Sequence, residues 1–218
     1  IGVVGSGQMG RGIAQVAAFS GFEVVMYDLN QESLDFGMDF IKNQLVRGVK
    51  KEKWDQNTAD ETFTRIQPSS KIESMAKCDL IIEAATENKE IKFKIFEDLD
   101  AIAKPEAILA TNTSSISITE IASKTKRADK VAGMHFMNPV PVMKLVEGIS
   151  GLETSEETFA AVQAASEKMG KVFVKAKDMP GFAVNRILMP MINEAVYTLH
   201  EGIASVEDID AAMKLGTN

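Results

Sequence analysis

The sequence is poor in the features that mark extracellular, membrane-spanning and nucleic-acid-binding proteins. Its 218 residues include a single cysteine, Cys78, so the chain can form no internal disulfide, which favours a reducing compartment such as the cytoplasm. No apolar run approaches the ~18 residues that a membrane span requires. Acidic residues outnumber basic ones by 31 to 24, and no basic stretch can neutralise a row of phosphates. We therefore expect a cytoplasmic protein that binds neither a membrane nor a nucleic acid.

The composition that remains is that of a globular protein. With 45% hydrophobic and 25% charged residues, the chain is long enough to bury a sizeable core. Cys78 stands just before the apolar run "DLIIEAA", so we interpret it as structural. The chain opens at Ile1, already in a strand pattern, and we therefore expect leading residues to be missing. A removed targeting segment is neither indicated nor excluded.

Short apolar runs alternate with longer segments of helical pattern along most of the chain. Apolar runs bounded by turn residues are typical of buried parallel strands, and their alternation with helices predicts right-handed crossovers. The patterns "SITE" and "TSEE" mark two helix starts. We therefore predict an α/β fold with a doubly wound, mostly parallel sheet. The predicted strands are 1–5, 22–28, 79–85, 107–112 and 130–136, and the predicted helices are 8–20, 31–50, 58–65, 88–103 and 117–124.

From about residue 178 the pattern becomes helical. A turn at "DMPGF" is followed by a long helix that ends at Gly202, and Pro190 should kink its axis. A second helix follows at 205–216, and two helices alone bury little surface. We therefore predict two domains: residues 1–177 form a cofactor-binding domain, and residues 178–218 begin an all-helical domain.

The first strand runs into a glycine-rich turn of known chemistry. Gly5, Gly7 and Gly10 form a G-x-G-x-x-G pattern that follows a strand and opens a helix, the Rossmann arrangement for a dinucleotide. The helix N-terminus offers free N–H groups to the diphosphate, and Asp28 at the end of the second strand suits the ribose hydroxyls. No arginine follows Asp28 to receive a 2′-phosphate, so we predict NAD. The predicted contacts in this region are Gly5, Gly7, Gln8, Met9, Gly10 and Asp28.

Other polar residues follow the later strands, at the edge where open sheets bind ligands. Glu87 and Lys92 come after the third predicted strand, and Asn112, Ser114 and Ser115 after the fourth. Each alone is more often a cap or turn residue than a ligand. Because they share one edge of the sheet, we predict that they contribute to the cofactor site.

His135 lies in an uncharged stretch, 131–143, with Glu147 twelve positions later. The stretch alone favours a satisfied core histidine, since intermediate burial is ordinary for this residue. The alternative is a proton-transfer pair, in which a carboxylate orients the imidazole and stabilises its cation. "MKLVE" has the pattern of a strand that returns beside His135. The other histidine, His200, stands near a predicted helix end and is interpreted as a surface residue.

The segments "GSGQMGRGIAQ", "LATNTSSISITEIA", "GMHFMNPVPVMKLVE" and "PGFAVNRILMPMINEA" resemble the L-3-hydroxyacyl-CoA dehydrogenases, and most of all the bacterial short-chain 3-hydroxybutyryl-CoA dehydrogenases. The resemblance spans nearly the whole chain. It implies reversible oxidation of (S)-3-hydroxyacyl-CoA to 3-ketoacyl-CoA with NAD, and a homodimer when the chain is full length.

The resemblance also implies roles for individual residues. His135 matches the catalytic histidine and Glu147 its acidic partner, while Ser114 and Asn185 match residues that contact the acyl substrate. Asn138, Glu87 and Lys92 match cofactor contacts. We expect no metal. Lys50 and Lys51 match the position of CoA-phosphate contacts. They belong to a basic stretch, Lys42 to Lys53, which on composition is either a solvated helix end or an anchor for a phosphorylated ligand.

Two departures and two alternatives accompany this resemblance. Met137 stands where the family often has phenylalanine, and the family continues beyond "KLGTN" into further helices, so we expect the chain to be truncated. One alternative is an enzyme acting on an unesterified hydroxy acid, which would commonly use a lysine in place of the histidine. The other is a crystallin-like protein that keeps the cofactor fold without turnover.

Overall fold

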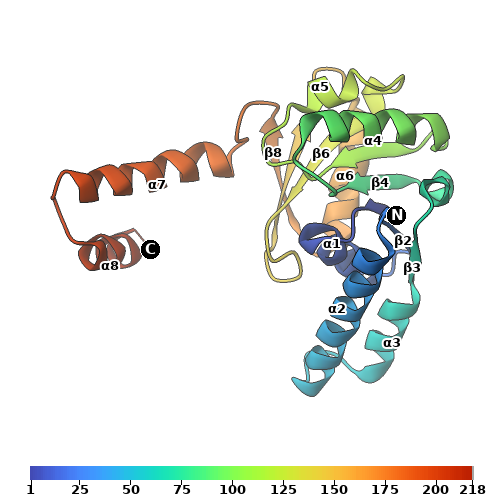
Figure 1. Cartoon of the computed structure of the whole chain (residues 1–218), viewed down its shortest axis with the longest axis horizontal. Helices are drawn as coiled ribbons and strands as arrows, with labels where there is room; N and C mark the ends of the chain where they lie inside the picture. Colours follow the sequence, from blue (N-terminus) through green and yellow to red (C-terminus); the bar gives the residue numbers. More distant parts are fainter. Residues whose placement is uncertain (218) are drawn as a thin grey trace.

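The computed structural model, which describes residues 1–217, is built on one eight-stranded sheet (Figure 1). The strand order is β3-β2-β1-β4-β5-β6-β7-β8. Neighbouring strands are parallel throughout, except that β7 runs antiparallel to β6. The predicted fold class is therefore confirmed. The strands are β1 (Gly2–Val4), β2 (Val24–Tyr27), β3 (Ile66–Ser69), β4 (Leu80–Glu83), β5 (Ile108–Thr111), β6 (Val131–Phe136), β7 (Leu145–Ser150) and β8 (Val172–Lys177).

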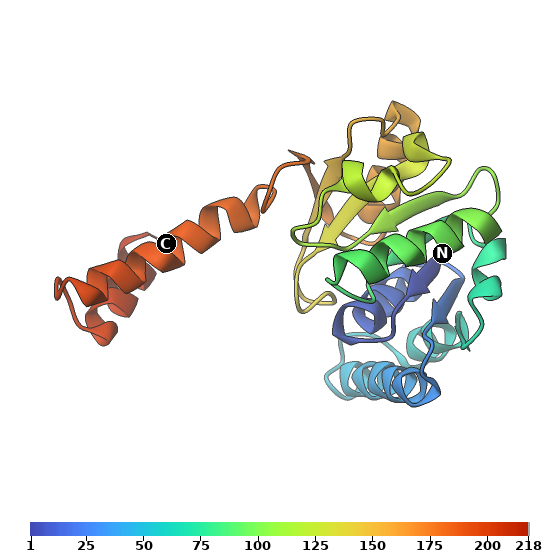
Figure 2. The same cartoon turned by 45° about the horizontal axis from the view of Figure 1, so that its top comes forward.

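Helices cover both faces of the sheet, and each face has its own apolar core. One core contains Ile13 of α1, Leu34 of α2 and Val162 of α6, and the other contains Phe96 of α4 and Ile121 of α5. Figure 2 shows the two sets of helices on opposite sides of the strands. The helices are α1 (Gln8–Phe19), α2 (Gln31–Lys50), α3 (Gln56–Thr64), α4 (Lys89–Ile102), α5 (Ile118–Ala122) and α6 (Glu156–Lys168), with 3-10 turns at η1 (Ile72–Lys77) and η2 (Ala128–Lys130).

The five predicted strands are present at or near their expected bounds, and the strand expected to return beside His135 is β7. The sequence did not predict β3 or β8. Both are edge strands with polar residues: β3 contains Pro68, and β8 alternates lysines with apolar residues and is largely exposed. Such strands lack the continuous apolar run of a buried parallel strand.

The last two helices, α7 (Val184–His200) and α8 (Val206–Gly216), extend away from the sheet (Figures 1 and 2). No residue of either helix is buried within the described part of the chain. α7 includes Pro190 in its first turns and bears His200 at its exposed end. The division into domains at residue 178 stays a prediction. Among residues 1–217, no helix combines the length and apolar character needed to cross a membrane.

Candidate active site

The carboxyl ends of the parallel strands lie at one edge of the sheet, and most of the predicted site residues lie in loops that leave this edge. The first loop is the glycine turn after β1. Gly5 has a φ of +100°, which favours glycine, and a Cβ on Gly10 would lie 1.8 Å from the carbonyl oxygen of Gly5. The turn therefore tolerates no side chain at either position.

The start of α1 fits an anionic ligand. Gly7 is its N-cap residue and offers no side-chain cap, and the first turn contains no acidic side chain. A Cβ added to Gly7 would meet nothing within 4 Å, so the space beside this residue is open. Free N–H groups facing open space are what a dinucleotide diphosphate requires.

Asp28 connects the glycine turn to the end of β2. Its Oδ2 accepts hydrogen bonds from the backbone N–H and the hydroxyl of Ser6, both at 2.8 Å, and its Oδ1 accepts one from the backbone N–H of Asn30. A carboxylate has about four acceptor positions, so Oδ1 retains capacity for a ribose hydroxyl. Ser6 was missed by sequence reasoning, although its place between two glycines of the motif was a usable signal.

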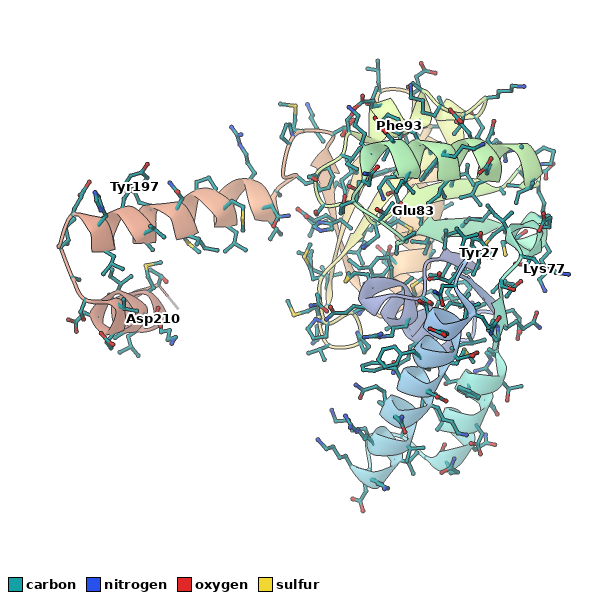
Figure 3. The ribbon with its side chains drawn as sticks, viewed as in Figure 1. Tyr27, Lys77, Glu83, Phe93, Tyr197 and Asp210 are labelled. Carbon is teal, nitrogen blue, oxygen red and sulfur yellow. The ribbon has the colours of Figure 1, made fainter. Side chains whose placement is uncertain are left out.

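A buried ionic cluster lies beneath the same edge. The ammonium group of Lys92 donates to Glu83 and Thr111, and its side chain is 1% exposed. Glu83, labelled in Figure 3, also accepts a hydrogen bond from the backbone N–H of Ala85 in the following loop. The ammonium group of Lys92 is thus bonded to protein oxygens and does not reach a surface that a ligand could contact. Its predicted contact with the cofactor stays a prediction. Glu83 was missed, although a carboxylate at the end of an apolar strand is unusual.

Glu87 and Ser114 are brought together across two loops. Glu87 accepts hydrogen bonds from the backbone N–H of Ser114 at 2.8 Å and from the hydroxyl of Thr113 at 2.7 Å. Asn112 is buried, and its Oδ1 accepts from the backbone N–H of Phe136 at 2.9 Å, next to His135. The loops after β4 and β5 are therefore bonded to each other and to β6.

His135 and Glu147 face each other directly in the antiparallel register of β6 and β7. Nδ1 of His135 lies 2.8 Å from Oε2 of Glu147, and the two side chains are 9% and 0% exposed. The other oxygen, Oε1, accepts hydrogen bonds from the backbone N–H groups of Ala183 and Val184, both at 2.9 Å. The buried carboxylate is therefore paired on both oxygens, and it holds the imidazole in one orientation.

Two cavities lie near these residues. The smaller, about 520 Å³, is lined by Ser114 and Ser115 on one side and by Asn185 and Arg186 of α7 on the other. It brings together Ser114 and Asn185, two predicted substrate contacts that are 71 positions apart in the sequence. His135 does not line this cavity.

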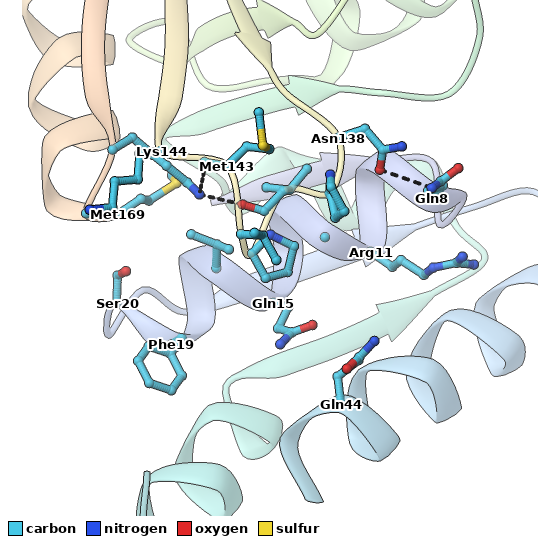
Figure 4. Close-up of a pocket in the computed structure, with 18 of the residues that line it drawn as sticks. Gln8, Arg11, Gln15, Phe19, Ser20, Gln44, Asn138, Met143, Lys144 and Met169 are labelled. Atoms are coloured by element: carbon cyan, nitrogen blue, oxygen red, sulfur yellow. Dashed lines mark hydrogen bonds between the residues drawn. The ribbon is translucent and has the colours of Figure 1, made fainter. Parts of the chain in front are cut away.

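The larger cavity, about 560 Å³, lies between α1, the second half of α2 and the loop after β6 (Figure 4). It begins at Gln8 and Asn138, whose side chains are joined by a 3.0 Å hydrogen bond. None of the described residues that line it is an aspartate or glutamate, although the chain carries a net charge of −7. Four cationic side chains line it: Arg11, Lys53, Lys144 and Lys171.

Two of these cations are held by their surroundings. The guanidinium of Arg11 lies over the ring of Phe40, 4.2 Å from its centroid. Lys171 donates to the carbonyl oxygens of Val140 and Met143, and burial lowers its pKa. The predicted CoA-phosphate residues Lys50 and Lys51 are exposed at the end of α2 and line neither cavity. Lys53 and Arg11, which sequence reasoning did not select, line the larger one.

Cys78 belongs to one of the two apolar cores, in agreement with its structural interpretation. Its side chain is 4% exposed, and burial raises the pKa of the thiol. The thiol lies near the amino end of β4, so it takes no part in the edge described above.

Comparison with known proteins assigns both parts of the chain. Residues 1–179 match the family described as 3-hydroxyacyl-CoA dehydrogenase, NAD binding domain, and residues 181–218 match 3-hydroxyacyl-CoA dehydrogenase, C-terminal domain. A 3-hydroxybutyryl-CoA dehydrogenase of Bradyrhizobium diazoefficiens is 50% identical over 218 residues, which are 100% of this chain and 74% of that protein. The human mitochondrial hydroxyacyl-coenzyme A dehydrogenase is 45% identical, over 98% of this chain and 70% of its own length. The crystal structure of (S)-3-hydroxybutyryl-CoA dehydrogenase from Ralstonia eutropha superimposes with a TM-score of 0.97 at 50% identity, covering 100% of this chain and 77% of that one.

Proposed function

Because the chain belongs to the 3-hydroxyacyl-CoA dehydrogenase family, we propose that it catalyses the reversible, NAD-dependent oxidation of (S)-3-hydroxyacyl-CoA to 3-ketoacyl-CoA. The names of its bacterial relatives favour 3-hydroxybutyryl-CoA as the substrate. The observation that carries the proposal is the buried pair of His135 on β6 and Glu147 on β7. His135 stands near the carboxyl end of β6, at the same sheet edge as the glycine turn.

In this proposal the glycine turn holds the cofactor. Gly5, Gly7, Gln8, Met9 and Gly10 receive the diphosphate at the start of α1, and Asp28 binds the adenine ribose. Glu87, Lys92, Asn112, Ser114 and Asn138 surround the nicotinamide end, with Glu87 fixing the Ser114 loop. When bound, NAD supplies the hydride acceptor.

His135 then removes the proton of the substrate hydroxyl. If Nδ1–H donates to Glu147, the lone pair of the neutral ring lies on Nε2, where it can accept that proton. The imidazolium that forms is stabilised by the buried carboxylate 2.8 Å away. In the reverse direction His135 protonates the keto oxygen. Ser114 hydrogen-bonds this oxygen as charge builds on it, and Asn185 contacts the acyl group from α7.

The larger cavity provides a place for the phosphates of CoA. Its acid-free lining and three of its cations, Arg11, Lys53 and Lys144, favour a polyanion. Lys50 and Lys51, which stand three and two positions before Lys53, would add to the positive charge at its rim. The exposed apolar residues of α7 and α8, such as Ile192, Val196 and Leu215, support a second domain from residue 178 that pairs two subunits. We further propose that this homodimer is cytoplasmic.

The test is the oxidation of NADH by the full-length protein with acetoacetyl-CoA as the other substrate. We expect turnover, and His135→Ala should lose most of kcat while KM for NADH changes by less than about twofold. Faster turnover of free acetoacetate would favour the hydroxy-acid alternative. NADH binding without turnover of either substrate would favour the crystallin-like one.

A further inference from the structure

The segment from Asp178 to Val184, here called the strap, connects β8 to α7 (Figure 1). Two of its residues are exposed, but its path is defined by its backbone and by the buried Phe182. Gly181 and Phe182 have positive φ values of 81° and 50°, and the backbone N–H of Phe182 donates to the carbonyl oxygen of Met179. The Phe182 side chain is 6% exposed, and its ring packs edge-on against His135 with centroids 5.7 Å apart. The strap therefore has one defined path across the catalytic pair.

Carboxylates fix the strap at both ends. At its far end, Glu147 accepts from the backbone N–H groups of Ala183 and Val184, so the partner of His135 also anchors the start of α7. At its near end, Asp178 bonds to the start of α5. Its Oδ2 accepts from the hydroxyl of Ser117 at 2.7 Å and from the backbone N–H of Thr119 at 2.8 Å, and its Oδ1 accepts from the backbone N–H of Ile118 at 2.9 Å.

These bonds join the strap to the loop that carries Ser114. Ser117, which Asp178 holds, is three residues after Ser114, and α7 presents Asn185 immediately after the strap. The smaller cavity described above is lined by Ser114, by Asn185 and by two strap residues, Pro180 and Gly181. The bonds between the strap and α5 therefore join the two sides of this cavity.

We propose that Asp178 is a positioning residue for acyl-CoA turnover, because it fixes the strap to the Ser114 loop and so sets Asn185 opposite Ser114. This inference rests on the proposed function. Asp178 touches neither reacting atoms nor cofactor contacts; it acts through the placement of two substrate-contacting side chains. Displacement of the strap by a fraction of an ångström would misplace the acyl group relative to His135.

Asp178→Asn tests the proposal in the full-length protein. The amide keeps the size of the side chain but has one acceptor oxygen, so it cannot serve Ser117, Ile118 and Thr119 together. We expect KM for acetoacetyl-CoA to rise about tenfold, with a smaller fall in kcat and with KM for NADH within about twofold of wild type. Ser117→Ala removes one bond and should raise the same KM about threefold.

Asp100→Asn is the matched control. Asp100 is a part-buried carboxylate that accepts from Arg127 at 2.6 Å and from the backbone N–H of Lys126 at 2.9 Å, near the end of α4 and away from the strap. Its substitution should lower the melting temperature without changing KM for acetoacetyl-CoA.

The inference is overturned if folded Asp178→Asn keeps the wild-type KM, or if Asp100→Asn raises KM equally. It is also overturned if KM for NADH rises with that for acetoacetyl-CoA. If Asp178→Asn does not fold, Ser117→Ala decides: an unchanged KM refutes the positioning role. A wild-type protein inactive on acetoacetyl-CoA is a different result, because it rejects the proposed function itself.

Discussion

Replacement of Glu147 by glutamine separates the two roles of this carboxylate, which orients His135 and anchors the start of α7. In the structure its Oε2 lies 2.8 Å from Nδ1 of His135, and its Oε1 accepts hydrogen bonds from the backbone N–H groups of Ala183 and Val184. The glutamine amide has the same shape but a single acceptor oxygen. It must therefore turn its oxygen either to the histidine or to the two N–H groups.

The energies decide the orientation. An unsatisfied buried donor costs about 1–3 kcal/mol, so facing two backbone N–H groups with an NH₂ is the more costly choice. The oxygen should turn to Ala183 and Val184, which leaves the NH₂ to donate to Nδ1 of His135. That contact favours the tautomer with the proton on Nε2, which cannot accept a proton from the substrate.

The fall in rate follows from the loss of the carboxylate charge beside His135 and from the loss of the productive tautomer. A charge-assisted hydrogen bond contributes about 1.5–3 kcal/mol, or roughly 10- to 150-fold in rate if it stabilises the imidazolium. The corresponding acid-to-amide change in a Ser-His-Asp triad, which also fixes the wrong tautomer, costs about 10⁴-fold. We therefore expect kcat of Glu147→Gln to fall by between about 10² and 10⁴, with a modest loss of stability.

The assay is steady-state NADH oxidation with acetoacetyl-CoA, accompanied by thermal unfolding to establish that the variant is folded. Glu61→Gln is the matched control, because Glu61 forms an exposed ion pair with Arg65 on α3 and its loss should leave kcat unchanged. A folded Glu147→Gln protein with kcat within about threefold of wild type would refute the assigned roles.

Two further predictions concern the glycine turn and acid stability. Gly10→Ala should disrupt both folding and NADH binding, since its Cβ would lie 1.8 Å from the carbonyl oxygen of Gly5. Gly7→Ala should fold normally and lose only NADH affinity, because its Cβ would meet no residue other than its chain neighbours within 4 Å. Equal effects of the two substitutions in thermal unfolding would contradict this. Burial alone would raise the pKa of Asp178, but the hydrogen bonds from Thr119, Ser117 and Ile118 outweigh it and hold the pKa below the ordinary 3.8. Its stabilising contribution is therefore present above pH 3.8 and is lost as the pH falls through the lowered pKa of the folded state. The free energy of unfolding of Asp178→Asn, measured with denaturant, should therefore depend less steeply on pH in this range than that of wild type. Parallel curves would show that Asp178 contributes nothing to this dependence.

The sequence alone predicted those parts of the protein that depend on interactions between residues close together in the chain. The apolar runs of the buried strands, the glycine turn and Asp28 at the end of β2 are readable because each depends on residues within one crossover unit. The pairing of His135 with Glu147 was also within reach, because a single loop joins their antiparallel strands. Their predicted roles, and those of Ser114 and Asn185, came from the family resemblance.

Tertiary structure decided the contacts between residues that the chain brings together from distant crossovers. β3 and β8 look like loops in sequence, since an edge strand needs no continuous apolar run. Glu87 meets Ser114 only because β4 and β5 are neighbours, and Arg11 joins Lys53 only because α1 packs against α2. Asp178 belongs to a turn in sequence and becomes an anchor because the strap passes the start of α5. A hydrogen bond depends on distances of a few tenths of an ångström, and no spacing along the chain encodes them.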